Sequence, residues 1–235
     1  MDYHDQPVDL GCQRVACPKC GTLNEIVAIS VVRPGDPALL QLFKGTLNRV
    51  VCSACRTVSL VDVPLFYRDD SEGYFVYFIP GADLRDAAKC ADAERTMQEI
   101  INGFTGEGAA TKGEVGRRGE YRLALTRKSF IEKISLHTNH IDDRIVEYIK
   151  YQLLNRRGSR IDPIRSELLY DFSTQDEERL PFIVFDRETG RATAGAHVPM
   201  GLYRELADMV TSDDDFDEEL RRLFPTYHVS VERLL

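Results

Sequence analysis

Four cysteines are arranged in two pairs that have the spacing of metal ligands. The pairs are Cys17 with Cys20 and Cys52 with Cys55, each in a CxxC motif. A CxxC turn places two sulfurs on one side of a tight loop, and two such turns supply the four thiolates of a closed tetrahedral zinc site. We therefore predict one bound Zn²⁺ ion, with a structural role because four thiolates leave no open position for water.

Two other chemistries also use paired cysteines. A thioredoxin-like redox site has one CxxC at the start of a helix in a βαβ unit, and neither pair has that setting. An iron–sulfur cluster takes four thiolates, but its usual motifs bring the cysteines closer in sequence than Cys20 and Cys52. Iron and redox chemistry stay open as alternatives. Cys12 and Cys90 are expected to be free thiols, with Cys12 as a substitute ligand near the first pair.

Composition and charge narrow the class of protein. The chain has 235 residues, enough for one large domain or two small ones, and a net charge of −8. That charge disfavours nucleic-acid binding, which depends on clustered Lys and Arg. No apolar run approaches the roughly 20 residues of a membrane-spanning helix, and the first residues lack the basic start of a signal peptide. With CxxC pairs rather than a disulfide pattern, we expect a cytoplasmic protein.

The elements that position the cysteines are predicted to form a zinc-ribbon-like β unit over residues 1–80. Asp36 and Pro37 have the pattern of a helix start and Gly45 that of a helix end, so a short helix is inserted between the two pairs. Val27, Ile29 and Val31 alternate with small or apolar residues, which favours a strand buried on both faces. Further strands are expected at 46–51, 57–63 and 74–79.

Residues 81–235 are predicted to be a mixed region of helices and antiparallel strands, which makes the fold class α+β. Ser129 and Glu132 match a capping box, and Asp142 is placed to cap the next helix. The glycine-rich segment 105–119 is expected to be a flexible loop. His228–Leu235 is expected to add an edge strand. Other helices are predicted at 88–102, from Pro199 and after 213–219, and other strands at 121–125, 168–172, 180–186 and 191–198.

Several of these segments together resemble the CpXC family, bacterial and archaeal proteins named for their cysteine motif and largely without assigned function. The resemblance is carried by the CPxCG sequence at Cys17, by Asp36-Pro37, and by Gly45–Asn48 before the second pair. It continues in three later segments, Leu65–Asp69, Phe130–Ile134 and Ile141–Glu147. The resemblance implies metal binding by the four cysteines, whereas Arg56 and the long glycine-rich segment depart from the pattern.

A second polar constellation lies around residue 140. His137 and His140, followed by Asp142 and Asp143, could form another metal site. The alternative is a polar connection between two helices, in which Asp142 is the cap while Asp143 and Glu147 complement the helix dipole. The segment is also a candidate surface for a partner.

Basic residues gather in two groups. A solvated face is the default interpretation, and a phosphate-binding patch would form if the groups converged. The groups comprise Arg117, Arg118 and Arg122, and Arg156, Arg157, Arg160 and Arg165.

The sequence has no recognisable catalytic motif: a phosphate loop, a nucleophile elbow and a zincin helix are all missing. The first hypothesis is a zinc-stabilised, non-enzymatic protein-interaction or assembly module that engages another protein or a second copy. A zinc-ribbon nucleic-acid-binding protein is the second hypothesis, by analogy of fold. An enzyme with an unrecognised site is the third.

Overall fold

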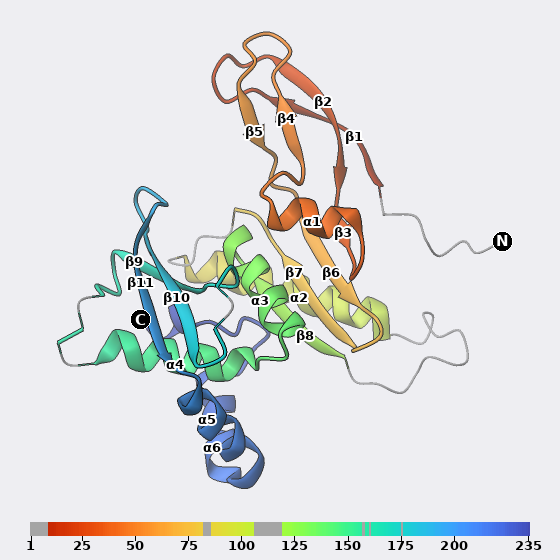
Figure 1. Cartoon of the computed structure of the whole chain (residues 1–235). Coiled ribbons are helices and arrows are strands. Elements are labelled where there is room, and N and C mark those ends of the chain that lie inside the picture. Colours follow the sequence, from red (N-terminus) through yellow and green to blue (C-terminus); the bar gives the residue numbers. More distant parts are fainter. Residues whose placement is uncertain (1–8, 82–85, 106–118, 157, 160, 175) are drawn as a thin grey trace.

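The computed structural model describes residues 9–81, 86–105, 119–156, 158–159, 161–174 and 176–235 (Figure 1). Within these residues it contains six α-helices and eleven strands, so the predicted α+β class is confirmed. No helix in the described part is long and apolar enough to cross a bilayer. Most of the predicted glycine-rich loop lies outside the described residues.

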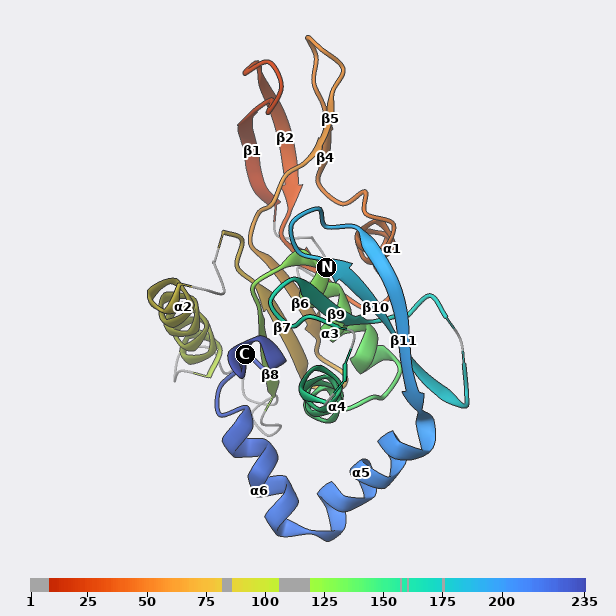
Figure 2. The ribbon, with the colours of Figure 1, turned by 90° about the vertical axis from the view of Figure 1, so that its left-hand side faces the viewer.

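Two short antiparallel hairpins carry the cysteines. Figures 1 and 2 show both hairpins projecting from the same side of the body of the molecule. Each CxxC motif forms the turn of its hairpin, and the predicted short helix lies between them in sequence, beginning at Pro37 as expected. The elements are β1 (Asp9–Ala16) with β2 (Leu23–Ile29), α1 (Pro37–Phe43), and β4 (Arg49–Val51) with β5 (Val58–Leu60).

A four-stranded sheet forms the base of the hairpins. Its order is β3-β6-β7-β8, with β6 and β7 antiparallel and both outer pairs parallel. Helix α3 packs on it through Phe130 and Ile134, and α2 packs beside β8. The elements are β3 (Val31–Val32), β6 (Leu65–Asp69), β7 (Tyr74–Phe78), α2 (Ala87–Thr105), β8 (Glu120–Ala124) and α3 (Arg127–Thr138). The sheet includes strands from both sides of residue 80, and the division at that residue stays a prediction.

The remaining elements build a second core. The antiparallel sheet β11-β10-β9 packs with α4, α5 and α6 around buried side chains such as Ile149, Phe182 and Leu220. The elements are α4 (Asp143–Asn155), β9 (Ser166–Tyr170), β10 (Arg179–Asp186), β11 (Ala192–Pro199), α5 (Met200–Ser212) and α6 (Asp214–Leu223). The strands expected here are present, with ends shifted by one or two residues. The last helix was expected to follow the acidic run 213–219, but it begins at Asp214 and includes that run.

Three further local expectations were wrong. The N-cap of α3 is Thr126, which forms a capping box with Ser129, so Ser129 itself stands at the third helical position. Residues 231–233 form a 3₁₀ helix rather than an edge strand, and the N–H of Val231 bonds to a buried carboxylate. Val27 is 59% exposed because β2 belongs to a two-stranded hairpin and has only one covered face.

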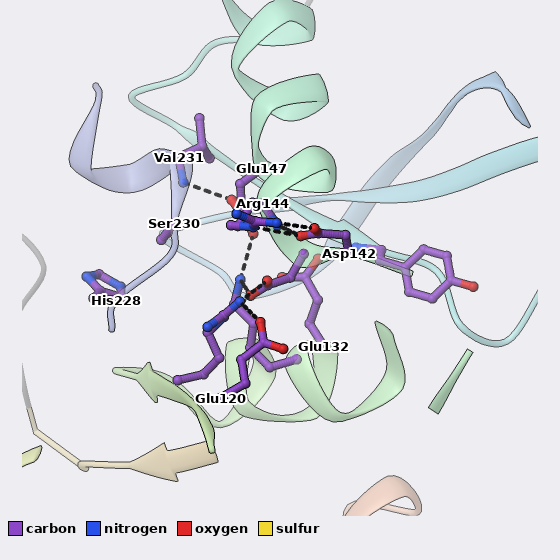
Figure 3. Close-up of polar contacts among 12 residues, drawn as sticks. Glu120, Glu132, Asp142, Arg144, Glu147, His228, Ser230 and Val231 are labelled. Atoms are coloured by element: carbon purple, nitrogen blue, oxygen red, sulfur yellow. Dashed lines mark hydrogen bonds and ion pairs between the residues drawn. The ribbon is translucent and has the colours of Figure 1, made fainter. Parts of the chain in front are cut away.

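A chain of buried charges connects the two cores (Figure 3). Arg122 on β8 donates two 2.8 Å hydrogen bonds to Asp143 on α4, and Nζ of Lys133 on α3 lies 2.8 Å from the same carboxylate. Nζ of Lys150 lies 2.8 Å from Glu147 and 2.7 Å from Glu132. All six side chains are at most 8% exposed. Three positive charges therefore face three negative charges away from water.

Two carboxylates of this network also bind backbone. Glu132 accepts a hydrogen bond from the N–H of Tyr170 on β9, and Glu147 accepts one from Val231. Burial raises the pKa of Asp143, but Arg122 and Lys133 more than offset it and hold the pKa below its usual range. The charges are thus paired and hydrogen-bonded, the condition under which ionised groups persist in a core. At Glu132 burial outweighs the attraction of Lys150 and raises the pKa of the carboxyl.

We predict that Lys150→Met strongly destabilises the fold. Met is similar in length but neutral, so Glu132 and Glu147 lose their nearest cation while staying buried. Removing one partner of a buried pair costs about 3–5 kcal/mol, and urea unfolding of purified protein would measure the loss.

Arg222→Met is the matched control. It removes an exposed pair with Glu218, in which the two side chains are 71% and 63% exposed. Exposed pairs contribute at most about 1 kcal/mol. Similar losses of unfolding free energy in the two variants would contradict a special role for the buried network.

Candidate metal centre

Each CxxC turn is closed by the same pair of backbone hydrogen bonds. In the first turn, Cys17 N–H donates to Thr22 C=O and Gly21 N–H donates to Cys17 C=O, both at 2.9 Å. In the second turn, Cys52, Arg56 and Thr57 repeat this pattern at 2.9 and 3.0 Å. The two turns are therefore equivalent knuckles. Each has a threonine five residues after its first cysteine, a shared feature that is visible in the sequence.

The two knuckles bring their four sulfurs together. Cys17 Sγ lies 3.6 Å from Cys55 Sγ, and Cys20 Sγ lies 3.6 Å from Cys52 Sγ. All four sulfurs lie within 4.8 Å of one another. A tetrahedral site with metal–sulfur bonds of about 2.3 Å requires sulfurs about 3.8 Å apart. The predicted ligands thus fit a single metal ion, whose identity the geometry leaves open.

Asparagine side chains hold the hairpins in this arrangement. Asn24 on β2 accepts a 2.9 Å hydrogen bond from the N–H of Ser53, inside the opposite knuckle. Near the base of the hairpins, Asn48 bonds both the N–H and the C=O of Ile29, at 2.9 and 2.8 Å. Both asparagines are buried. Sequence reasoning missed them because such contacts join residues 19 and 29 positions apart.

The residue after each second cysteine has a left-handed backbone. The φ angle is 73° at Gly21 and 59° at Arg56. Glycine adopts this conformation without strain, whereas a residue with a Cβ atom does so at a cost. Arg56 is therefore a strained position, and the second knuckle has the same geometry as the first despite that strain.

The surroundings of the cysteines in the two knuckles shift the pKa values of their thiols in opposite directions. The N–H of Cys55 lowers the pKa of the Cys52 thiol, to about 6, although burial acts in the opposite direction. At Cys17 the N–H groups of Cys20 and Lys19 lower the pKa, but burial and the neighbouring thiols outweigh them and raise it to about 11. The neighbouring thiols therefore raise the pKa of Cys17 but lower the pKa of Cys52 and Cys55, and a cation at their centre would favour the thiolate form of the cluster.

The other cysteines lie outside the cluster. Cys12 on β1 is exposed and Cys90 lies on α2, so neither belongs to the converging group. The closest sulfur contacts join one knuckle to the other, and the CxxC turns connect strands rather than open helices. This arrangement favours a shared metal over a thioredoxin-like dithiol.

The histidine and aspartate constellation around residue 140 does not form a second ligand cluster. Among the described residues, the cysteines are the only group of three or more metal-binding side chains that converge. His137 instead hydrogen-bonds Asp69 at 3.1 Å and stacks on Tyr74, with ring centroids 4.0 Å apart. Asp142 caps α4 as predicted, and Asp143 belongs to the buried charge network.

The residues of this constellation line a polar recess of about 310 Å³. Its lining includes Glu72, Glu120, His140 and Arg144, and no serine, threonine, cysteine or lysine. Arg144 binds Asp142 and Glu120 binds Arg122, so these charges are already engaged. The rest of its lining is Tyr74, His137, Ile141, Asp142 and Asp143. His137 is paired with Asp69, and the two aspartates are paired with Arg144 and Arg122.

Several charged residues that were expected on the surface are buried in the structure. Asp143 and Glu147 are 4% and 2% exposed, so neither side chain can contribute to a partner-facing surface in this segment. Arg122 is likewise buried against Asp143 and cannot join a phosphate patch. Arg156 is exposed at the end of α4, whereas Arg117, Arg118, Arg157 and Arg160 lie outside the described residues.

The two knuckled hairpins define a zinc-ribbon-like protein with a four-cysteine cluster able to hold a metal ion. The chain belongs to the CpXC protein family, whose model matches residues 15–150 and so spans both knuckles, the four-stranded sheet and most of α4. Comparison with curated proteins and with solved structures finds no match for this chain.

We predict that Cys17→Ser and Cys52→Ser each abolish binding of the metal and unfold the hairpins. A serine hydroxyl is a poor substitute for a thiolate, and the binding free energy of a structural metal is also folding free energy. Elemental analysis of purified protein and proteolysis of the hairpins would measure both effects. Cys12→Ser is the matched control, and full metal content in the Cys17 variant would contradict the four-cysteine site.

Proposed function

We propose that the four cysteines bind a structural Zn²⁺ ion. The observation that carries this proposal is the closed set of four thiolates, which satisfies tetrahedral zinc and leaves no coordination position for a substrate. The second hairpin has strands of three residues each, too short to be stable alone. The bound Zn²⁺ ion then holds the two hairpins against each other.

The zinc-stabilised hairpins form a non-enzymatic interaction module. Each hairpin turns one face outward and leaves large apolar side chains in water. Val27 is 59% exposed on β2, and Val51 and Val58 face each other across β4 and β5 at 46% and 48% exposure. Leu23 and Leu60 extend the two faces at 61% and 46%. Such side chains on a projecting, metal-stiffened element favour contact with another protein.

The charge of the hairpins indicates the kind of partner. The two hairpins, residues 9–29 and 49–60, contain four basic and two acidic side chains, in a chain whose net charge is −8. With four thiolates and one Zn²⁺ added, the net charge of the hairpins is zero, so they lack the negative charge of the rest of the chain. An acidic protein surface is therefore repelled less by the hairpins than by the body. Because the thiols must remain reduced to bind zinc, we also assign the module to the cytoplasm.

The four basic side chains of the hairpins favour a second candidate, a nucleic acid. Arg14, Lys19, Arg49 and Arg56 are exposed and would reach phosphates if the hairpins lay along a backbone.

We predict that a photo-crosslinking amino acid at position 27 captures a specific protein partner in cells. The same amino acid at position 164, where Ile164 is 75% exposed on the body, serves as the matched control. Mass spectrometry of the adducts would identify the partner, and Leu23→Glu should abolish the adduct by placing a charge in the apolar face. Identical adducts at positions 27 and 164 would contradict a binding surface on the hairpins.

The nucleic-acid candidate makes a different prediction. Labelled RNA or DNA would be retained at low salt, and Arg49→Glu would release it while Arg222→Glu on α6 would not. Retention that ignores both substitutions, or no retention at low salt, excludes this candidate.

A further inference from the structure

Strand β11 leaves one edge of its sheet without a partner. It pairs with β10 on one side, and no strand among the described residues pairs with its other side. Figure 2 shows β11 at the margin of the molecule before it enters α5. Residues 192–195 and His197 are exposed. Such an edge presents backbone N–H and C=O groups that can bond another strand.

The outward-facing groups belong to Gly195 and His197. Pro181 on β10 is opposite His197, and its carbonyl accepts a hydrogen bond from Asp171 on the β9 side. The pair Pro181–His197 is therefore not hydrogen-bonded across β10 and β11. Bonded and non-bonded pairs alternate in an antiparallel ladder, so the N–H and C=O of Gly195 and His197 point away from β10.

The edge is protected at its ends and open at its centre. The register shifts by one residue between Val184 and Phe185, which places a bulge at Thr193, and Pro199 ends the strand. Both features limit pairing. Between them, the five residues from 194 to 198 carry no charged side chain, although 29% of the chain is charged. Exposed edge strands in natural proteins usually carry charged side chains, which prevent pairing with another strand.

We propose that this edge pairs with the same edge of a second copy of the chain, which gives a two-fold symmetric dimer with a continuous six-stranded sheet. The two-fold axis passes between the Ala196 residues. Gly195 of each copy then exchanges two hydrogen bonds with His197 of the other copy.

The edge is complementary to itself in both bonding and size. Two residues separated by one position, each with an outward donor and acceptor, match their own antiparallel copy. The side chain of His197 then lies opposite a glycine, which has none, and Ala196 faces Ala196. The uncharged strand also lets two chains of net charge −8 meet without placing like charges in contact. This surface is separate from the hairpins, and the inference does not depend on the proposed function.

Engineered cysteines test the register. In the proposed dimer the Ala196 residues form a non-hydrogen-bonded pair with Cα atoms about 4.5 Å apart, within reach of a disulfide. Ala196→Cys should therefore produce a covalent dimer on a non-reducing gel under mild oxidation of zinc-loaded protein. Ala194→Cys is the matched control on the same strand, because position 194 faces position 198 of the other copy and lies too far from its own counterpart. Equal cross-linking of both variants, or of neither, overturns the proposal.

Proline tests the hydrogen bonds without cysteine chemistry. Gly195 has no positive φ, and a Cβ atom there would lie 3.9 Å from Phe182 C=O, an ordinary contact. Gly195→Pro removes an outward N–H, a change that an edge strand tolerates, whereas Gly195→Ala keeps it. Light scattering of a dilution series should give twice 26.7 kDa for the wild type and the alanine variant. The proline variant should be monomeric at concentrations where the others are dimers. A monomeric wild type at every concentration, or a proline variant that dimerises equally well, overturns the proposal.

Discussion

The geometry of the N-terminal half depends on the convergence of four sulfurs. The second hairpin has only three residues in each strand, and both hairpins expose one face to water, so hydrophobic burial contributes little to holding them together. The asparagine bonds from Asn24 and Asn48 join the hairpins but leave the knuckle tips with clustered thiols. A metal ion between those thiols would join the two knuckle tips directly. The positive φ at Arg56 fits this view, since the knuckle keeps its shape against backbone strain.

The body of the molecule depends on a different interaction, the buried charges between β8, α3 and α4. Glu132, Lys133, Asp143 and Glu147 belong to the segments that carry the resemblance to the CpXC family. In the structure these residues point inward and pair with one another and with Arg122 and Lys150. Buried ion pairs add little net stability compared with apolar packing, but each requires its partner in one place. The network therefore specifies how the two helices lie on the sheets.

Sequence reasoning was most successful where a local pattern has one physical solution. Two CxxC pairs indicated the ligand cluster, Asp36-Pro37 marked the start of α1, and Asp142 was recognised as the cap of α4. It failed where a side chain serves a distant partner. Glu132 has the spacing of a capping box yet bonds Tyr170 and Lys150, and Asp143 and Glu147 resemble a solvated first turn yet are buried. Charge alone does not reveal burial, because the compensating charges lie on other elements. Strand β1 and strand β6 were also missed, the first because its residues do not alternate in polarity.

The bond between Glu147 and Val231 joins residues separated by 84 positions. During synthesis, α3 and α4 emerge from the ribosome long before residue 231, so for that interval Glu147 lacks one of its hydrogen bonds. Domains with such distant contacts fold slowly, because the intervening chain must first be ordered. The nascent chain can form its hairpins and its four-stranded sheet early. The hydrogen bond from Val231 to Glu147 in the buried charge network can form only after residue 231 has left the ribosome. Ribosome-bound chains shorter than this would carry a body that is compact but incompletely bonded.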